Sequence, residues 1–473
     1  MRKAVVLGGG MAGMLAAAAL AQTADRVIVV EGDRFPESPL PRRGLPQGHH
    51  NHMFMSGGCT ALEKLLPGAL EALSTAGAKR RGMPSQILTL SAQGWYRRHQ
   101  GDASVIACSR ELLDHKVRQL VLSNERIELR ESTKIIGLSG TAGRVTGAQV
   151  ERDGRTETID ADLTVDATGR TSHAPDWLVA LGLPRVQEEL VDAGFAYASR
   201  LYRAPAGARP DFPGVLVEAR AGTGRPGRGA ALMPNEGDRW IVALIGTRGG
   251  TPPTDEAGFR EFMRSLDDPI IGDLVDQATP AGDIRAYRGL PNRRRRYEKL
   301  PVPEGFVVVG DAATTLNPNY ATGMSVAALG ALFLRDEIAR TGTGPQLSRR
   351  LQAGIAKAGD GPWQMATGTD QWYPDVTMNI RRAPRLARRF AERFAQVTTQ
   401  DAALSNLSFN VASLQAPPAS MMTVPALFTV LRGRRQAPLT AAEAIAQYPE
   451  FGTLTGAEAT GVPAPRAADR VRP

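Results

Sequence analysis

Cysteine is scarce in this sequence, which has only Cys59 and Cys108 among 473 residues. Two cysteines cannot build a disulfide framework or, alone, a zinc site, and we expect two buried free thiols in a reducing compartment. Aromatic residues make up only 5%, which argues against a protein built around stacked bases. The sequence also lacks the spacing of a catalytic triad, a metal cluster or a pair of acids.

The remaining composition is that of a globular protein of two or three domains, with 42% hydrophobic and 22% charged residues. The uncharged run at 4–21 imitates a signal peptide. Three consecutive glycines occupy the place of its apolar core, and the run is too rich in glycine and alanine for a membrane span. We therefore expect a retained segment and a cytoplasmic protein without a membrane span.

The formal net charge of +9 suggests an anionic cofactor or nucleic acid as a partner. Arginine clusters at 293–296 and 381–393 are expected to be solvated surface. A basic nucleic-acid-binding protein is the non-enzyme alternative, and it predicts a colourless protein whose binding weakens with salt.

The first 31 residues form one continuous pattern. Residues 3–7 predict a buried parallel strand, 14–22 a helix rich in alanine and leucine, and 27–30 a second strand. The sequence Gly-x-Gly-x-x-Gly lies between the first strand and the helix, at 8–13, and Glu31 ends the second strand. This strand, glycine turn, helix, strand and acid predict a dinucleotide-binding unit.

Each residue of the pattern has a physical role. Gly8 makes the tight turn, Gly10 lets a pyrophosphate approach the backbone, and Gly13 lets the helix pack against the strand. The helix N-terminus offers N–H groups and a positive dipole end to the phosphates. Glu31 accepts hydrogen bonds from a ribose and repels a 2′-phosphate.

Residues 41–52 contain three of the six histidines, yet their spacing does not suit a metal site on one helix face. We expect a loop that covers an anionic cofactor, with Arg42 or Arg43 paired to it. A second Gly-x-Gly-x-x-Gly at 222–227 contains Pro226 and leads into a strand-like segment. We interpret it as a hairpin loop, so that the chain has one nucleotide-binding fold.

Later segments also combine an expected strand or helix with polar residues at its end. Ser109 and Arg110 open an expected helix, and 165–170 (Val-Asp-Ala-Thr-Gly-Arg) ends an expected strand. Residues 306–309 predict another buried strand, with Asp311 at its carboxyl end, where open α/β sheets bind ligands. A carboxylate there can accept a hydrogen bond from a hydroxyl group of a ligand.

The segment 317–325 reads Asn-Pro-Asn-Tyr-Ala-Thr-Gly-Met-Ser, and a helix is expected over 323–336. Its N-terminus supplies N–H donors and positive potential.

Together these segments resemble FAD-dependent monooxygenases of the p-hydroxybenzoate hydroxylase fold, in particular the branch of the polyether-ionophore polyene epoxidases, which is similar to squalene epoxidase. The matching motifs span residues 5 to about 335. The resemblance implies an FAD site without a metal, made by Gly8, Gly10, Met11, Ala12, Gly13, Glu31, Arg42, Arg110, Asp311, Gly323, Met324 and Ser325.

The expected fold is α/β, with a Rossmann-type FAD-binding domain, an inserted antiparallel β-sheet substrate domain and a C-terminal helical region. The segments are 1–173 and 301–345 for the FAD-binding domain, 174–300 for the substrate domain, 346–456 for the helical region and 457–473 for a disordered tail. Within the helical region, a packed surface helix over 379–396 is favoured over a basic membrane-surface helix.

The resemblance implies an activity as well. Reduced FAD and O2 give a C4a-hydroperoxide, which transfers one oxygen atom to an apolar secondary metabolite. Alkene epoxidation of a polyketide or terpenoid is favoured; aromatic hydroxylation and flavin-dependent reduction of a prenyl or polyketide substrate stay open. We expect Tyr320 to wall the substrate pocket, although it could also simply pack.

Two further features bear on the reaction. Flavin halogenases carry a Trp-x-Trp-x-Ile-Pro segment and an essential lysine, whereas the five tryptophans here are far apart, which disfavours halogenation. Asp166-Ala-Thr-Gly-Arg170 departs from the Asp-Gly and Arg pattern with which aromatic hydroxylases serve FAD and NADPH. NAD(P)H is therefore expected as the electron source, with a separate flavin reductase as a candidate partner.

Overall fold

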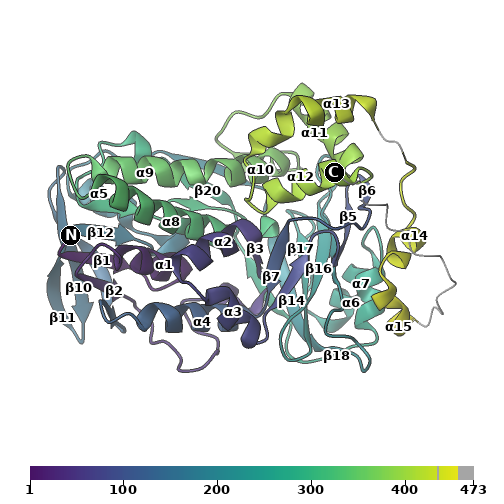
Figure 1. The fold of residues 1–473 in the computed structure, drawn as a ribbon, viewed down its shortest axis with the longest axis horizontal. Coiled ribbons are helices and arrows are strands. Elements are labelled where there is room, and N and C mark those ends of the chain that lie inside the picture. Colours follow the sequence, from purple (N-terminus) through teal and green to yellow (C-terminus); the bar gives the residue numbers. More distant parts are fainter. Residues whose placement is uncertain (434–435, 456–473) are drawn as a thin grey trace, which may run out of the picture.

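Residues 1–433 and 436–455 are described by a computed structural model, in which a parallel sheet lies at one end and a larger sheet at the other (Figure 1). The parallel sheet has the strand order β21-β12-β1-β2-β8. The bounds of these strands are Lys3–Leu7 (β1), Arg26–Val30 (β2), Ile127–Arg130 (β8), Leu163–Asp166 (β12) and Phe306–Val308 (β21). The predicted strands at 3–7, 27–30 and 306–309 are confirmed.

The parallel sheet is covered on both faces. Ala4 and Val6 of β1 pack with helices, whereas Val5 and Leu7 face a three-stranded sheet of β9 (Lys134–Gly140), β10 (Val145–Arg152) and β11 (Arg155–Asp160). Burial on both faces explains why these strands are continuous apolar runs instead of alternating ones.

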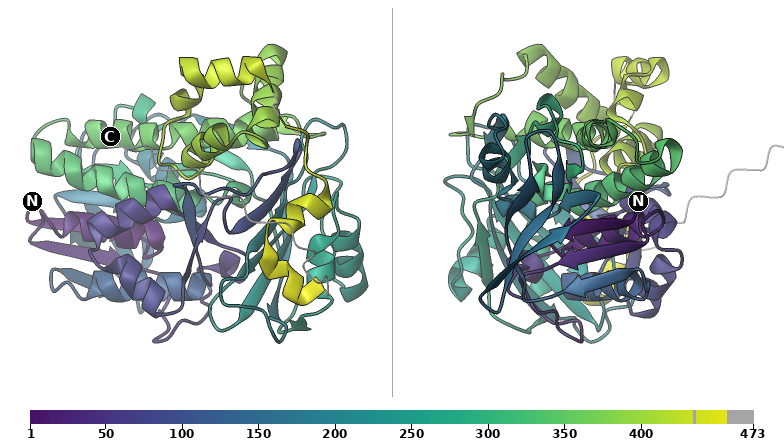
Figure 2. Two further views of the ribbon diagram at one scale, coloured as in Figure 1. Left: turned by 45° about the vertical axis from the view of Figure 1, so that its right-hand side comes forward. Right: turned by 90° about the vertical axis from the view of Figure 1, so that its left-hand side faces the viewer.

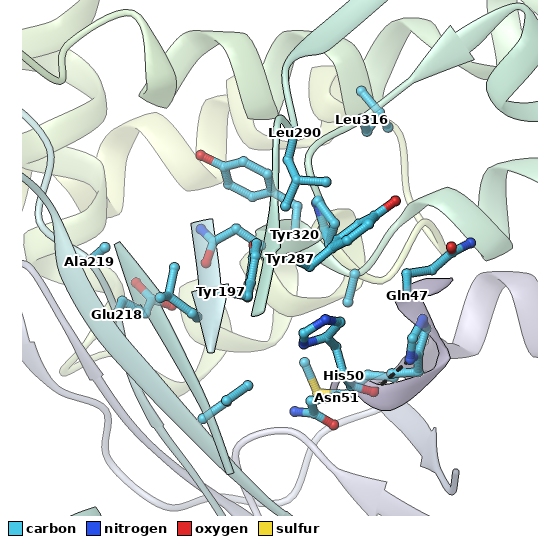
Figure 3. Close-up of a pocket in the computed structure, with 18 of the residues that line it drawn as sticks. Gln47, His50, Asn51, Tyr197, Glu218, Ala219, Tyr287, Leu290, Leu316 and Tyr320 are labelled. Atoms are coloured by element: carbon cyan, nitrogen blue, oxygen red, sulfur yellow. Dashed lines mark hydrogen bonds between the residues drawn. The ribbon is translucent and has the colours of Figure 1, made fainter. Parts of the chain in front are cut away.

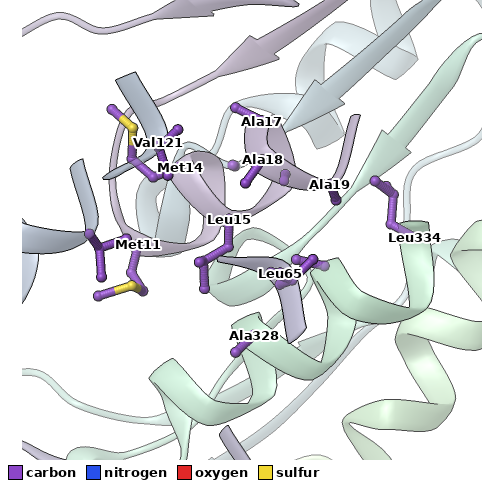
Figure 4. Packing of buried hydrophobic residues seen from close by; sticks show 14 of the residues in the cluster. Met11, Met14, Leu15, Ala17, Ala18, Ala19, Leu65, Val121, Ala328 and Leu334 are labelled. Carbon is purple, nitrogen blue, oxygen red and sulfur yellow. The ribbon is translucent and has the colours of Figure 1, made fainter. Parts of the chain in front are cut away.

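Helices cover the first face: α1 (Met11–Leu20), α2 (Ser56–Leu65), α3 (Ala69–Thr75), α4 (Arg110–Leu122), α8 (Gly323–Thr341) and α9 (Leu347–Ala358). Alanine side chains let α1 pack closely between its neighbours, and Figure 4 shows Ala17–Ala19 of α1 with Leu65, Ala328 and Leu334. The short α5 (Ala174–Ala180) packs on the opposite face.

The larger sheet has the strand order β18-β14-β17-β16-β15-β5-β6, and β19 also pairs with β14. Its strands are β5 (Ile87–Ser91), β6 (Gly94–Trp95), β14 (Ala196–Arg203), β15 (Gly214–Val217), β16 (Arg228–Pro234), β17 (Arg239–Gly246), β18 (Thr279–Pro280) and β19 (Arg285–Arg288). One face packs on α6 (Glu256–Arg264) and α7 (Ile270–Val275), and the other faces a cavity. The segment at 222–227 joins the antiparallel strands β15 and β16, as the hairpin interpretation predicted.

The larger sheet extends beyond the 174–300 range expected for the substrate domain. Strands β5 and β6 come from residues 87–95, inside the segment assigned to the first part of the FAD-binding domain. β5 pairs in parallel with β15, Ile87 opposite Gly214. A parallel pairing between strands so far apart along the chain has no local turn signal, so sequence patterns could not reveal it.

Two small sheets connect the ends of the molecule. One consists of β3 (Met53–Met55), β7 (Ser104–Ala107) and β4 (Lys79–Gly82); the other of β22 (Thr314–Thr315), β20 (Asn292–Arg295), β13 (Glu188–Asp192) and β23 (Thr377–Met378). β20 contains most of the arginine run 293–296, which was expected to be solvated surface. That expectation is wrong for Arg294 and Arg295, which are buried and paired with Asp360 and Glu188.

The C-terminal region is mainly helical: α10 (Asp360–Asp370), α11 (Arg385–Thr398), α12 (Ala402–Ala412), α13 (Val424–Arg432), α14 (Ala441–Ala446) and α15 (Gly452–Thr455). The helix expected over 379–396 begins later, after Pro384, because proline suits a helix start. Figure 2 shows α14 and α15 against the larger sheet, where Tyr448 and Phe451 are buried. The tail expected to be disordered, 457–473, lies outside the described residues.

Within the described ranges, no helix has the length and apolar character needed to cross a membrane. Both cysteines are buried and free, as expected.

Candidate active site

The glycine turn between β1 and α1 leaves an open position at the start of the helix. Gly8 has a φ angle of +98°, and a Cβ on Gly13 would lie 1.8 Å from the Gly8 carbonyl oxygen, so the turn requires glycine at position 13. Gly10 precedes α1 without a side-chain cap, and no atom lies within 4 Å of the position of a Cβ there. Because the first turn also has no acidic residue, its N–H groups are free to bind an anion.

The turn contacts the segment that follows β21. A Cβ on Gly310 would lie 2.6 Å from the Cβ of Ala12, so only glycine permits this approach. Met11 is buried in the core between the helices. The segments that follow β1 and β21 are thus in contact, although β12 lies between these strands in the sheet, and Asp311 comes close to the glycine turn although 300 residues separate them in the chain.

Glu31 and Arg42 form a cluster beside this turn. The two Glu31 carboxylate oxygens accept hydrogen bonds from the backbone N–H groups of Gly9 (2.8 Å) and Asp33 (2.9 Å). The buried Arg42 guanidinium lies 3.2 Å from Asp33 and 3.8 Å from Glu31. Arg42, predicted to pair with an anionic cofactor, therefore pairs with carboxylates in this structure.

Asp114 on α4 connects Arg42 to the predicted residue Arg110. Its carboxylate lies 3.4 Å from Arg42, 3.5 Å from Arg110 and 3.7 Å from Arg118. The Arg110 side chain is buried against Met324, and its Nε has no hydrogen-bond partner in the part of the chain that the structure describes. Asp114 was not predicted as a site residue. Its spacing of four residues from both Arg110 and Arg118 on one helix would have indicated these ion pairs.

Asp311 and the start of α8 form the next part of the site. The Asp311 carboxylate faces a cavity and has no hydrogen bond or ion pair within the part of the chain that the structure describes. Burial raises its pKa to about 6. A Cβ on Gly323, the first residue of α8, would lie 3.7 Å from Asp311 Oδ1, so this carboxylate lies at the N-terminus of the helix.

The remaining predicted residues of α8 have different surroundings. Met324 contacts Arg110, whereas the hydroxyl of the fully buried Ser325 accepts a hydrogen bond from the Met55 backbone N–H at 3.2 Å. The hydroxyl of Thr322, just before the helix, is buried and has no hydrogen-bond partner among the described residues. Helix α8 has no side-chain cap and no acid in its first turn, so its N-terminal N–H groups are free.

A cavity of about 280 Å³ lies beyond Asp311, between residues 47–53, the inner face of the larger sheet and residues 315–321. Figure 3 shows its aromatic and aliphatic side chains around the central space. Its lining includes Gln47, His50, Asn51, Tyr197, Leu216, Glu218, Ala231, Ile245, Tyr287, Leu290, Leu316, Tyr320 and Tyr373. The cavity therefore combines an apolar wall with a few polar groups, as ligand sites commonly do.

Tyr320, expected to wall the substrate pocket or simply to pack, lines this cavity, and its hydroxyl is held by the protein. That hydroxyl donates to Asp370 at 2.8 Å, and Asp370 also accepts from the side-chain amides of Asn292 and Asn317. Burial raises the pKa of Asp370 to about 7. Asp370 was not predicted as a partner of Tyr320, because it lies 50 residues away along the chain, at the end of α10.

The three clustered histidines have separate roles in the structure. His49 is exposed, whereas the Nδ1 of His50 hydrogen-bonds Ser199 at 2.8 Å and its ring lies between Tyr197 and Tyr287. Burial lowers the pKa of His50 to about 4 and that of His52 to about 3, so both are neutral. Among residues 1–433 and 436–455, no three metal-ligating side chains gather into a site.

Glu218 is a further cavity residue that the sequence analysis missed. Its side chain keeps accessible surface because it faces the cavity, yet protein surrounds it closely enough to raise its pKa to about 7. No lysine lines the cavity in the described part of the chain.

No protein-family model matches the chain. Protein Rv3254 of Mycobacterium tuberculosis (strain ATCC 25618 / H37Rv) is 30% identical over 422 residues, covering 85% of this chain and 87% of that protein.

Solved structures show the same fold at low sequence identity. The flavin-dependent brominase Bmp2 aligns with a TM-score of 0.66 at 14% identity, covering 90% of this chain and 96% of that one. The p-nitrophenol 4-monooxygenase PnpA from Pseudomonas putida DLL-E4 aligns with a TM-score of 0.61 at 16% identity, covering 92% of this chain and 100% of that one. The flavin-dependent halogenase CmlS aligns with a TM-score of 0.61 at 18% identity, covering 88% of this chain and 77% of that one. The chain thus has the α/β fold of flavin-dependent monooxygenases and halogenases, with the predicted C-terminal helices.

Proposed function

The chain belongs to the same family as the Mycobacterium tuberculosis protein Rv3254, and we propose that it is an FAD-dependent monooxygenase. One observation carries the proposal: the segment after β21 contacts the glycine turn, which has open space at Gly10, and its Asp311, unpaired within the described residues, lines a cavity at the same edge of the parallel sheet. This is where an open α/β sheet binds its ligand. The fold of flavin-dependent enzymes supports the same cofactor.

The residues of the site fit FAD at both of its ends. The free N–H groups of α1 and the space at Gly10 suit the pyrophosphate, and Glu31 suits the adenosine ribose. Asp311, which lacks a partner in the described chain, suits a ribityl hydroxyl. Met11 and Ala12 contribute backbone at the turn, and the buried Arg42 steadies Glu31 by its charge.

Helix α8 and Arg110 suit the flavin ring. The N–H groups of Gly323, Met324 and Ser325 form the first turn of α8 and provide positive potential for a ring that becomes negative on reduction. Arg110, with a buried Nε that lacks a partner, adds a positive charge on the same side. When bound and reduced, FAD supplies the activation of O2, and the protein supplies orientation and exclusion of water.

Oxygenation is favoured over halogenation by the cavity itself. The halogenases of this fold are expected to use a lysine, and none lines the cavity in the described ranges. Apolar and aromatic side chains exclude water from the reacting carbon, with Tyr320 as a wall. We propose alkene epoxidation of an otherwise apolar polyketide or terpenoid, as the epoxidase resemblance implies, with aromatic hydroxylation as the second candidate.

Electrons are proposed to come from NAD(P)H through a separate flavin reductase. Arg170, at the position that departs from the NADPH-serving pattern, is already engaged, because its guanidinium donates to the Tyr287 hydroxyl at 2.9 Å and to the Gly289 carbonyl oxygen. A basic nucleic-acid binder is disfavoured, since the arginines of 293–296 largely serve internal ion pairs.

Absorbance of the purified protein tests the cofactor. Bands near about 370 and 450 nm are expected, with FAD released on heating. Gly10→Leu should remove them while the protein stays folded, because the new side chain would fill the phosphate position without meeting other atoms. Gly282→Leu is the matched control. Gly282 also has open space at its Cβ position, but it lies in the loop between β18 and β19, far from the glycine turn along the sequence. FAD retained by Gly10→Leu would contradict the pyrophosphate position.

The reaction is tested by supplying NADPH, a flavin reductase and a polyene under 18O2. Labelled epoxide, detected by mass spectrometry, supports epoxidation. Label on an aromatic substrate would move the assignment to hydroxylation, and an unlabelled saturated product would move it to reduction.

A further inference from the structure

Glu218 is directed into the cavity by the backbone of the larger sheet. It directly follows β15, and its N–H donates to the Leu90 carbonyl oxygen at 2.9 Å, which extends the pairing with β5. Val217 packs into the core on the outer face of the sheet. Because side chains alternate along a strand, Leu216 and Glu218 point to the opposite face, toward the cavity that they line. The orientation of the carboxylate is thus set by main-chain hydrogen bonds.

The Glu218 carboxylate has no partner within residues 1–433 and 436–455, either as a hydrogen-bond acceptor or in an ion pair. Arg220, two residues along the chain, and Arg170, which lines the same cavity, each have another partner. Arg220 pairs with Asp267 at 2.6 Å, and Arg170 pairs with the Tyr287 hydroxyl. The Tyr373 hydroxyl donates to the Ala219 carbonyl oxygen at 2.9 Å, so it is also engaged.

Glu218 is exposed to solvent in the cavity, and a mainly apolar ligand that fills the cavity would displace that solvent. Removing solvent from an acid is costly unless another group pairs with it. Burial raises the pKa of Glu218 to about 7, and no hydrogen bond offsets this effect. Fold stability alone gives no reason for such a group at this position, since Leu216, Ala219 and Ile245 line the cavity beside it. A ligand that donates to the carboxylate would remove the cost.

We infer that Glu218 is a substrate-binding residue, and that the substrate carries one hydrogen-bond donor, a hydroxyl or a protonated amine, on an otherwise apolar skeleton. Figure 3 shows Glu218 and Ala219 on one side of the cavity, across from Gln47 and His50 of the segment expected to cover the cofactor. The donor group therefore lies across the cavity from the cofactor side and orients the skeleton. This inference rests on the proposed function, because it assigns the substrate of the same cavity.

Binding of matched probes to the FAD-loaded protein tests the inference. Geraniol and geranylamine each carry a donor, and geranyl methyl ether has the same skeleton without one; 2-naphthol and 2-methoxynaphthalene form an aromatic pair. Isothermal titration calorimetry should give donor probes a dissociation constant about tenfold or more below that of the matched ethers. In Glu218→Leu this preference should disappear.

Two further variants make the result specific. Glu218→Gln keeps an acceptor without the charge, so it should retain the preference for alcohols and lose that for the amine, which separates the two kinds of donor. Glu261→Leu removes an acid from the surface of α6 and should leave all the affinities unchanged. Equal binding of donors and ethers to the wild-type protein, including no binding of either, would overturn the inference, as would a preference that survives in Glu218→Leu.

The flavin bands are recorded for every sample. Protein that shows no such bands after incubation with FAD contradicts the proposed function, whereas bands without the donor preference contradict only the role of Glu218. The two failures are therefore distinguishable.

Discussion

The glycine turn and the cavity are built in opposite ways. The turn consists of consecutive residues, and it would bind its ligand through backbone N–H groups that the start of α1 leaves free. The cavity takes side chains from residues 47–53, from the larger sheet and from the segment after β21, all far apart in the chain. The turn tolerates little change of backbone but depends on few side chains, whereas the cavity depends on individual polar groups held by distant partners.

The largest effect is expected at the turn, from Gly13→Ala. The added Cβ would lie 1.8 Å from the Gly8 carbonyl oxygen, so the turn cannot close without displacing β1 or α1. We expect a loss of more than about 4 kcal/mol in the free energy of unfolding, measured by denaturant titration.

Gly330→Ala is the control for this change. Gly330 is also helical, in α8, but has open space at its Cβ position, so alanine should be neutral or stabilising by up to about 1 kcal/mol. If the two variants had a similar free energy of unfolding, the close approach of Gly13 to the Gly8 carbonyl oxygen would not be what requires glycine at position 13.

In the cavity region the largest effect is expected from Asp370→Leu. The change leaves the Tyr320 hydroxyl and the amides of Asn292 and Asn317 without their shared acceptor. At least about 3 kcal/mol of stability should be lost, measured by denaturant unfolding. Asp370→Asn, which keeps the shape and one acceptor oxygen, should cost less; an equal cost in both variants would argue against the hydrogen-bond network.

A smaller and pH-dependent effect is expected from Glu218→Gln. The folded protein holds the Glu218 proton up to about pH 7, whereas the unfolded chain releases it near 4.5. The wild-type protein therefore binds more protons when folded and loses stability as the pH rises from 4.5 to 7, relative to the variant.

The melting temperature of Glu218→Gln minus that of the wild type should thus increase by a few degrees across this range and stay level above it. A difference that does not change with pH would mean that Glu218 titrates normally. Glu261→Gln, at an exposed site, should show no such trend.

The smallest effect is expected from Tyr320→Phe. The ring that lines the cavity remains, and Asp370 keeps two of its three donors, so the cost should be about 1 kcal/mol. If Tyr320 serves only as a wall, turnover should stay within a factor of about three. A much larger loss of turnover, with normal flavin absorbance, would assign its hydroxyl a direct part in the reaction.

The sequence predicted the parallel sheet and its glycine turn well because their signals are local. Gly8, Gly13 and Glu31 lie within 24 residues. The backbone of the turn requires the two glycines, and Glu31 accepts a hydrogen bond from the backbone of that turn. The place of Asp311, soon after a buried strand, was also predicted. The partner of Tyr320 was not, because Asp370 lies on a helix whose position depends on the packing of the C-terminal region.

Charge was the least reliable guide. The arginine run at 293–296 has the composition of a solvated surface, yet β20 places it opposite Glu188 and Glu189 of β13. Arg42, which with Arg43 was a candidate to pair with an anionic cofactor, has Glu31, Asp33 and Asp114 as its partners in this structure, and the sequence did not indicate them. Pairing across strands and between elements decides where such charges lie, and no local pattern reports it.

By itself the amino-acid sequence determined the strand, glycine turn, helix and strand at residues 3–30 and the acid that follows them, because these residues act through the conformation of their neighbours. The tertiary structure alone decided what surrounds the cavity, including the parallel pairing of β5 with β15 that extends to Glu218 and the hydrogen bond from Tyr320 to Asp370. These contacts join residues from 50 to over 120 positions apart, and only the burial of apolar surface over the whole chain brings them together.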